Sequence, residues 1–210
     1  MNILTLCTYP IANPMHGGQL RVRNIVDSYR AAGHRVEVVG VLGSEAYKTE
    51  AGFSAFPGLS QLATVIPNPF LMEDYAIGRF FAENARAFER LSSEIRIKPD
   101  VVHVEHPWLF AFARQYLEHN APSARIVYSS HTVDSRLKQE ILSSYFDAGT
   151  AHQNAELIMD IEMAAIEGAD AIVCVSESDA EWVMSQTVKP VVVAPNGVKA
   201  WQTTEAGRME

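Results

Sequence analysis

The sequence is poor in the features that mark several large classes of protein. Its 210 residues include two cysteines, Cys7 and Cys174, and both lie in apolar segments, which predicts buried free thiols in a reducing compartment. The 17 basic residues are outnumbered by 25 acidic ones, and the net charge of −8 argues against nucleic-acid binding, because phosphates require a basic surface. The sequence shows no basic leader, no Asn-x-Ser/Thr sequon and no apolar run of the ~18 residues that a membrane span needs. These absences predict a cytoplasmic protein without a nucleic-acid partner.

Several catalytic signatures are also absent. The chain has no G-x-G-x-x-G fingerprint, no P-loop, no G-x-S-x-G nucleophile elbow and no C-x-x-C pair. These absences argue against the usual dinucleotide site, a P-loop nucleotide site, an α/β-hydrolase active site and a dithiol redox centre.

Short apolar segments alternate with longer amphipathic ones along the chain. The predicted strands are Ile3–Cys7, Val36–Val41, Ala63–Ile66, Val101–Val104, Ile126–Ser129, Ala171–Val175 and Val191–Ala194. The predicted helices are Gly18–Ala32, Met72–Arg96, Pro107–His119, Asp134–Phe146, Thr150–Gly168 and Glu177–Gln186. Several strands are apolar on both faces, as in parallel sheets that are covered on both sides. The pattern predicts an α/β fold with a mostly parallel sheet of about seven strands and helices on both faces.

Two stretches depart from this alternation. Ser44–Leu71 is rich in glycine and proline and is predicted to be a long loop or short hairpin with exposed aromatic side chains. After Asn196-Gly197 the pattern stops, and the polar residues that follow read as a linker. We therefore predict one domain over residues 1–198 and a linker or tail over residues 199–210.

The loop between Thr8 and Gly18 is the first candidate for ligand binding, because ligands of open parallel sheets bind beyond the carboxyl ends of the strands. Its last residues, Gly17 and Gly18, open the first helix. Paired glycines at this position let backbone amides approach an anion, with the helix dipole behind them. A plain loop-to-helix turn explains the same glycines, so both interpretations stay open.

A second polar group follows the fourth predicted strand. His103, Glu105 and His106 are residue types that bind metals, but two histidines three apart across a strand end do not share a face, which argues against zinc. His103 has valine on both sides and is predicted to be a hydrogen-bonded interior histidine. Glu105 and His106 are predicted to lie beyond the strand, where they can reach a ligand.

A third polar group follows the fifth predicted strand. His131 stands where the strand ends and a helix is about to begin, so it could donate to a hydroxyl or stabilise developing charge. Capping of that helix by Thr132 or Asp134 explains the same cluster without any chemistry. The sequence of this segment does not decide between the two.

The segment Met72–Arg96 carries four arginines interleaved with phenylalanines. Peripheral membrane contact is one interpretation of such a helix. Five acidic residues are interleaved with the arginines, which favours a solvated face above an apolar stripe.

Taken in order, several segments resemble one known family. They are Gly17-Gly18, the run from Ala32 to Val39, the run from Pro99 to Val104, the run from Val127 to His131, the run from Ala169 to Glu177, and Pro195-Asn196-Gly197-Val198. Together they resemble the N-terminal domain of family 4 glycosyltransferases of the GT-B fold, over about residues 2–198. The runs Ala-Asp…Val-Ser-Glu and Pro-Asn-Gly-Val are the most specific parts of this resemblance.

The resemblance implies a Rossmann-like domain that forms half of a two-domain enzyme. Such enzymes move a sugar from a nucleotide-sugar donor to the hydroxyl of a glycan, lipid or small alcohol, with retention of configuration and without a metal or other cofactor. It implies that Gly17 and Gly18 bind the diphosphate of the donor and that His131 is a catalytic residue at the transferred sugar. It further implies that Ser176, Glu177, Asn196 and Gly197 lie near the cleft and the hinge. Three residues of the candidate loops are predicted at the acceptor site or the cleft from their positions: His16, Glu105 and His106.

The chain also departs from the family. The second Rossmann domain of the family supplies a basic pair and a Glu-x7-Glu motif, and neither belongs to this sequence, so we expect no turnover by the chain alone. Surface that a second domain of roughly 150–200 residues would cover favours self-association. A non-catalytic ligand- or partner-binding module that uses the aromatic stretch Phe53–Phe70 stays open as an alternative, as does half of an epimerase or phosphorylase.

Overall fold

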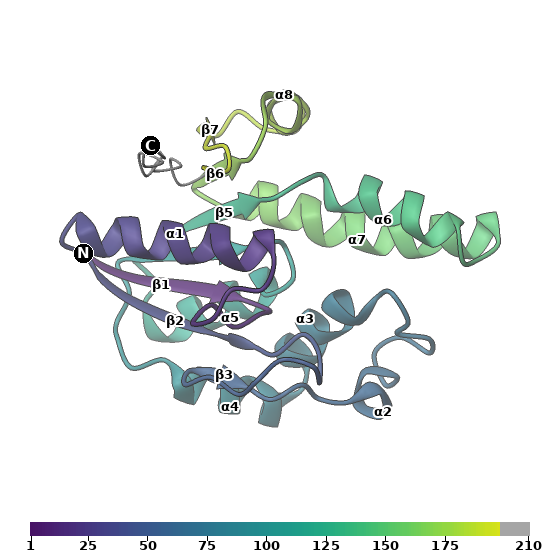
Figure 1. The fold of residues 1–210 in the computed structure, drawn as a ribbon, viewed down its shortest axis with the longest axis horizontal. Helices are drawn as coiled ribbons and strands as arrows, with labels where there is room; N and C mark the ends of the chain where they lie inside the picture. The colour runs from purple at the N-terminus through teal and green to yellow at the C-terminus, as the bar shows by residue number, and fades with distance from the viewer. Residues whose placement is uncertain (198–210) are drawn as a thin grey trace, which may run out of the picture.

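Seven parallel strands form one sheet, which confirms the predicted α/β class (Figure 1). The computed structural model describes residues 1–197, so the predicted linker at 199–210 lies outside the described residues. The strands are β1 (Asn2–Cys7), β2 (Arg35–Val41), β3 (Phe53–Ser54), β4 (Val101–Glu105), β5 (Arg125–Ser130), β6 (Ala171–Cys174) and β7 (Val191–Val193). Their order in the sheet is β3-β2-β1-β4-β5-β6-β7, with every neighbouring pair parallel. The order reverses between β1 and β4, and such a switch point is where open α/β sheets bind ligands.

Helices connect the strands and cover the sheet. They are α1 (Gly17–Ala31), α2 (Leu59–Leu62), α3 (Glu73–Glu83), α4 (Ala85–Glu94), α5 (Phe110–Asn120), α6 (Asp134–Ser143), α7 (Ala148–Gly168) and α8 (Glu177–Gln186). The turn after α1 uses Gly33 at a φ of +82°, a conformation that glycine adopts without strain. The pair α6 and α7 forms a long hairpin that projects from one end of the sheet (Figure 1).

The sheet is buried on both faces. Leu4 and Leu6 of β1 are fully buried in the larger core, which lies under α3, α4, α5 and α7. Cys7 of the same strand belongs to a smaller core with Val22 and Val26 of α1. Because side chains of a strand alternate between its faces, α1 covers one face of the sheet and the other helices cover the opposite one.

The predicted strand Ala63–Ile66 is wrong. These residues follow the short helix α2, and the edge strand of the sheet is instead Phe53–Ser54, inside the stretch predicted to be a loop. A four-residue apolar run does not distinguish a strand from a helical turn. The exposed aromatics predicted there are also only partly right, because Phe53 is buried whereas Phe70 is 47% exposed.

The predicted helix Met72–Arg96 is two helices. The chain is extended at Asn84, and the Asn84 side chain accepts a hydrogen bond of 3.0 Å from the Ala87 amide, so it caps α4. Arg79 pairs with Glu83, and Arg90 lies over the ring of Phe81. None of the helices in residues 1–197 combines the length and the apolar character needed to cross a membrane.

Candidate functional site

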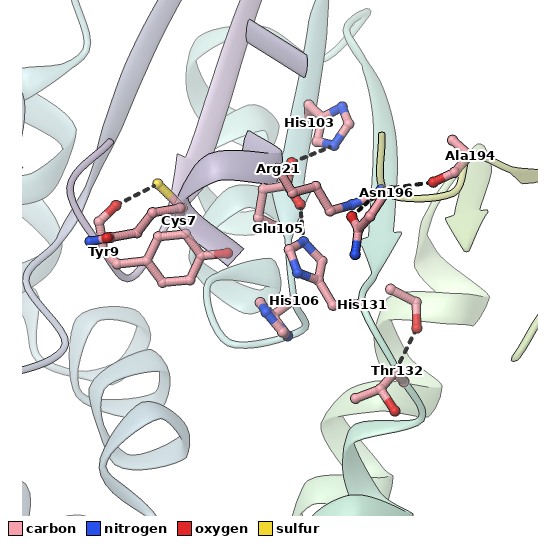
Figure 2. Close-up of polar contacts among 12 residues, drawn as sticks. Cys7, Tyr9, Arg21, His103, Glu105, His106, His131, Thr132, Ala194 and Asn196 are labelled. Carbon is pink, nitrogen blue, oxygen red and sulfur yellow. Dashed lines mark hydrogen bonds and ion pairs between the residues drawn. The ribbon is translucent and has the colours of Figure 1, made fainter. Parts of the chain in front are cut away.

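The polar groups predicted after β4 and β5 meet at the carboxyl edge of the sheet (Figure 2). The backbone amide of His106 donates to the Ser129 carbonyl at 3.0 Å, which joins the end of β4 to the end of β5. The imidazole rings of His106 and His131 then lie 4.1 Å apart, centroid to centroid. The structure thus brings together two histidines that are 25 positions apart in the sequence.

Glu105 lies within β4 and not beyond it, which corrects its predicted position. It is two residues from His103, so both side chains point to the same face of the sheet. Both are almost completely buried, at 1% exposure each. Glu105 is therefore positioned to contact other side chains of the domain.

A continuous chain of polar contacts runs from α1 to His131. The Tyr29 hydroxyl lies 2.8 Å from His103 Nδ1, and His103 Nε2 lies 3.0 Å from Glu105 Oε1. The other carboxylate oxygen, Glu105 Oε2, lies 2.6 Å from His131 Nε2. The prediction that His103 is an interior histidine with polar partners is confirmed.

The carboxyl group of Glu105 is ionised in this setting. Burial on its own would raise its pKa, because a charge is poorly solvated in the interior. The neighbouring imidazoles, His103 first and then His131, instead hold the pKa of Glu105 well below its usual value. The carboxylate accepts a hydrogen bond from His131 through Oε2, while Oε1 lies 3.0 Å from His103 Nε2.

The second imidazole has a carboxylate of its own. His106 Nδ1 lies 3.1 Å from Asp134 Oδ2, and the His106 backbone has a φ of 60°, which turns the chain sharply after β4. Burial lowers the pKa of His106, but the nearby carboxylates, Asp134 first, raise it above its usual value overall. Burial and the charge of His106 lower the pKa of His131, which Glu105 offsets only in part. The two neighbouring rings therefore favour different charge states.

The helix-capping alternative for Thr132 and Asp134 is wrong. Helix α6 has no side-chain cap at its N-terminus, and the Asp134 carboxylate is directed to His106. Two amides at the start of α6 are hydrogen-bonded by a residue of α7. Glu162 accepts from the amides of Asp134 and Ser135 at 2.7 and 3.3 Å. No local pattern in the sequence points to Glu162, because its role depends on how α7 packs against α6.

The glycine pair opens α1 at the same edge of the sheet. His16 caps this helix by accepting from the Gln19 amide, at 3.4 Å, and its ring also lies 3.0 Å from the Tyr47 hydroxyl. The first turn of α1 carries no acidic side chain. The Tyr9 ring lies edge-on to both His16 and His106, with centroids 5.3 and 6.3 Å away. A short row of rings therefore links the start of α1 to the imidazole pair.

Arg21 connects α1 to the segment that follows β7. Its Nη1 donates to the Ala194 carbonyl at 2.7 Å and to Asn196 Oδ1 at 3.1 Å (Figure 2). A groove of about 460 Å³ lies between α1 and this segment, and Gly17, Asn196 and Gly197 are among its lining residues. The structure thus places the predicted residues Asn196 and Gly197 beside Gly17.

Ser176 and Glu177 have a different setting. The Ser176 hydroxyl accepts from the Asp179 amide at 3.1 Å and so caps α8, while Glu177 is exposed on the first turn. Within residues 1–197, no hydrogen bond joins either side chain to the imidazole pair or to the glycine pair. Sequence reasoning missed Tyr29, whose contact with His103 spans 74 positions and follows only from the packing of α1 on the sheet.

The comparisons with known proteins agree with this architecture. The family model of Glycosyltransferase Family 4 matches residues 15–201. No curated protein matches the chain in sequence. Among solved structures, sucrose-phosphate synthase from Thermosynechococcus elongatus has a TM-score of 0.61 at 13% identity, over 94% of this chain and 48% of that one.

Two further structures show the same relation. The lipopolysaccharide outer core galactosyltransferase WaaB has a TM-score of 0.54 at 12% identity, over 96% of this chain and 47% of its own. The catalytic domain of starch synthase IV from Arabidopsis thaliana has a TM-score of 0.53 at 13% identity, over 94% and 51%. The chain spans about half the length of these structures. It belongs to glycosyltransferase family 4, and its sheet is a Rossmann-like half of a GT-B fold.

Proposed function

We propose that this domain is the acceptor-binding, N-terminal half of a retaining glycosyltransferase. The whole enzyme moves a sugar from a nucleotide-sugar donor to the hydroxyl of an acceptor, which is a glycan, a lipid or a small alcohol. The observation that carries the proposal is the position of His131 and its contacts with Glu105 and His106. Its ring is hydrogen-bonded to the buried Glu105, lies tilted against the His106 ring with centroids 4.1 Å apart, and stands at the carboxyl edge of the sheet.

The start of α1 supports a role in binding the donor diphosphate. Apart from its chain neighbours and the backbone of α1, no atom of residues 1–197 lies within 4 Å of where a Cβ on Gly17 would stand, so this point is open to a ligand. Backbone amides at a helix N-terminus attract anions, and the absence of an acidic side chain from the first turn leaves that attraction unopposed. Gly17 and Gly18 are thus assigned to the diphosphate, and His131 to the transferred sugar.

We propose that turnover also requires groups from a second domain. In sugar transfer from a nucleotide, negative charge develops on the departing diphosphate and must be met by preorganised donors. The amides of Gly17 and Gly18 supply one side of that environment. We assign the remaining donors to a second Rossmann domain and expect no turnover by the 210-residue chain alone, with no metal or other cofactor taking part.

The remaining predicted residues are assigned by position. His16 and His106 lie near the open edge, and Asn196 and Gly197 lie on the groove beside α1.

The exposed side chains of Leu20 and Val192, at 46% and 55%, line this groove and support the predicted tendency to self-associate. Sedimentation of concentrated protein measures that tendency.

The test pairs the chain with a separately produced C-terminal Rossmann domain of the same family and a panel of nucleotide-hexose donors. We expect donor hydrolysis or transfer with the mixture and none with the chain alone. His131→Ala is expected to lower the rate by about 100-fold or more. His152→Ala is the matched control, because His152 is an exposed histidine of α7 that pairs only with Glu156.

Two outcomes would contradict the proposal. An unchanged rate in His131→Ala would remove this residue from the catalytic site. Binding of a donor or acceptor by the chain, without transfer under any pairing, would favour the non-catalytic module instead.

A further inference from the structure

We propose that Glu105 is a positioning residue that holds His131 in a single tautomer, with His103 and Tyr29 holding Glu105 in turn. In this tautomer Nε2 of His131 carries the proton and Nδ1 presents a lone pair to the ligand. The inference rests on the proposed function, because it concerns the same imidazole. It deepens that function by making His131 an acceptor of a hydrogen bond from a ligand hydroxyl.

The two oxygens of Glu105 fix the first part of the arrangement. Oε1 lies 3.0 Å from His103 Nε2, and Oε2 lies 2.6 Å from His131 Nε2. The carboxylate side chain has no exposure, so water cannot replace either imidazole. An ionised carboxylate only accepts hydrogen bonds, and leaving it buried without donors is costly. His131 Nε2 therefore carries a proton, whereas the pair of His103 Nε2 and Glu105 Oε1 is a close contact without the geometry of a hydrogen bond.

The Tyr29 hydroxyl extends these contacts to α1. In the His103 tautomer that has its proton on Nε2, Nδ1 offers a lone pair, and the Tyr29 hydroxyl lies 2.8 Å from that atom. Burial, with a smaller effect from Glu105, raises the pKa of Tyr29, so its hydroxyl keeps the proton that it donates. Tyr29 thus donates to His103, and the His103 ring lies against the Glu105 carboxylate, 3.0 Å from Oε1. His131 donates to Glu105 from the opposite side.

The groups around His131 favour its neutral form. Three charged or titratable side chains act on this ring: His106, Glu105 and Arg21. His106 is itself paired with Asp134, and its ring lies 4.1 Å from that of His131, so a charge on His106 opposes a second charge on His131. Nδ1 of His131 has no hydrogen-bond partner among the described residues. In the neutral ring, Nδ1 therefore has a free lone pair that can accept a hydrogen bond from a ligand.

The polarity of this contact differs from the sequence-based expectation that His131 donates to a hydroxyl. An imidazole locked through Nε2 to a carboxylate can only accept at Nδ1 while it is neutral. A ligand hydroxyl meets this requirement because it can donate, whereas a bare phosphate oxygen cannot. His131 would therefore select the hydroxyl-bearing part of the donor or acceptor, while the amides of α1 take the anionic part.

The test reads the tautomer directly by long-range ¹H–¹⁵N correlation on the 210-residue chain labelled in histidine. We expect His131 at pH 7.5 to carry its proton on Nε2, by about tenfold or more over the other tautomer, because hydrogen bonds to charged groups are strong. A dominant Nδ1–H form, or a doubly protonated ring, would overturn the proposal. The readout needs no sugar transfer, so it separates failure of this inference from failure of the proposed function.

Glu105→Gln sharpens the test. A glutamine presents one acceptor oxygen and one donor NH₂ group, so the NH₂ group must face either His131 Nε2 or His103 Nε2. We expect one of these two imidazoles to switch to its Nδ1–H tautomer, and a variant in which both keep their native tautomers would contradict the positioning role. Glu118→Gln is the matched control, because Glu118 pairs with Arg114 on the exposed surface of α5.

Tyr29→Phe keeps the inference testable if Glu105→Gln fails to fold. This variant removes one hydroxyl and keeps the ring that packs near His103. We expect His103 to lose its preference for one tautomer, while His131 keeps the Nε2 proton through its own bond to Glu105. A change at His131 with none at His103 would contradict the proposed order of contacts.

Discussion

The two faces of β4 are equally buried and chemically opposite. Val102 and Val104 point into the larger core and have no exposure, while His103 and Glu105 point toward α1 and are 1% exposed. One face contributes packing energy that any apolar side chain of similar size could supply. The other contributes a set of hydrogen bonds that depends on the identity and protonation of each member. One strand therefore serves the stability of the sheet on one side and the chemistry of the site on the other.

Removing the carboxylate should produce the largest effect on stability. Glu105→Ala leaves His103 and His131 without an acceptor in a buried site, and we expect the free energy of unfolding at pH 7 to fall by roughly 3–5 kcal/mol. Urea denaturation followed by circular dichroism measures this change. A loss of less than about 1 kcal/mol would show that the polar face contributes nothing beyond packing.

The pH dependence of that loss distinguishes the two faces. The folded pKa of Glu105 lies below its unfolded value, so its contribution is fully present above about pH 4.3 and is lost as the pH falls further. Leu6→Ala, on the apolar face of β1, is the matched control. It should cost about 2–5 kcal/mol at every pH at which the domain folds.

A second buried carboxylate should show the opposite pH dependence. Burial, opposed by the hydrogen bonds of Ser135, raises the pKa of Glu162 to about 7. A raised carboxyl pKa favours the protonated form in the folded state, so the ionised group opposes folding as the pH rises from about 4.5 through 7. Between these values, the stability of Glu162→Gln relative to the native chain should increase by about 3 kcal/mol.

Denaturation of both proteins at pH 5, 6, 7 and 8 measures this trend. Glu156→Gln, an exposed position on the same helix, is the control and should show no such increase. A difference that stays constant with pH would mean that Glu162 is ionised in the folded domain at pH 5.

The smallest effect is expected at the break between α3 and α4. Asn84→Ala removes the side chain that accepts from the Ala87 amide, and we expect a loss of about 1 kcal/mol in the free energy of unfolding. Asn84→Asp keeps the acceptor and should recover most of the loss. An Asn84→Ala variant as stable as the native chain would mean that packing alone ends α3.

Much of the fold can be predicted from the sequence, because most strands are long enough to appear as apolar runs. The apolar runs at β1, β2, β4 and β5 are correct within one or two residues at each end, and the glycine after α1 marks its end. The edge strand β3 has only two residues, too few for any periodicity. Asn84 is a good N-cap residue, but it lies within a continuous amphipathic pattern that hides the break.

The site was less predictable because its contacts join distant elements. His103, Glu105, His106 and His131 are visible in the sequence, because each lies in or just after a strand that reaches the carboxyl edge. Tyr29 and Glu162 lie on helices, where a polar residue normally faces solvent. Their roles follow from which helix packs over which strand, and composition and periodicity contain no such information.

The hydrogen bonds from Arg21 to Ala194 and Asn196 bear on how readily strand β7 detaches from the sheet. They join residues 173 and 175 positions apart, and β7 is a three-residue strand that, within residues 1–197, pairs with β6 alone. Contacts of such long sequence separation form late in folding, and short edge strands are among the first elements to detach in native-state fluctuations. The two guanidinium bonds therefore oppose the detachment of β7, and amide exchange at Val191–Val193 in Arg21→Lys, compared with the native chain, reports how much they slow it.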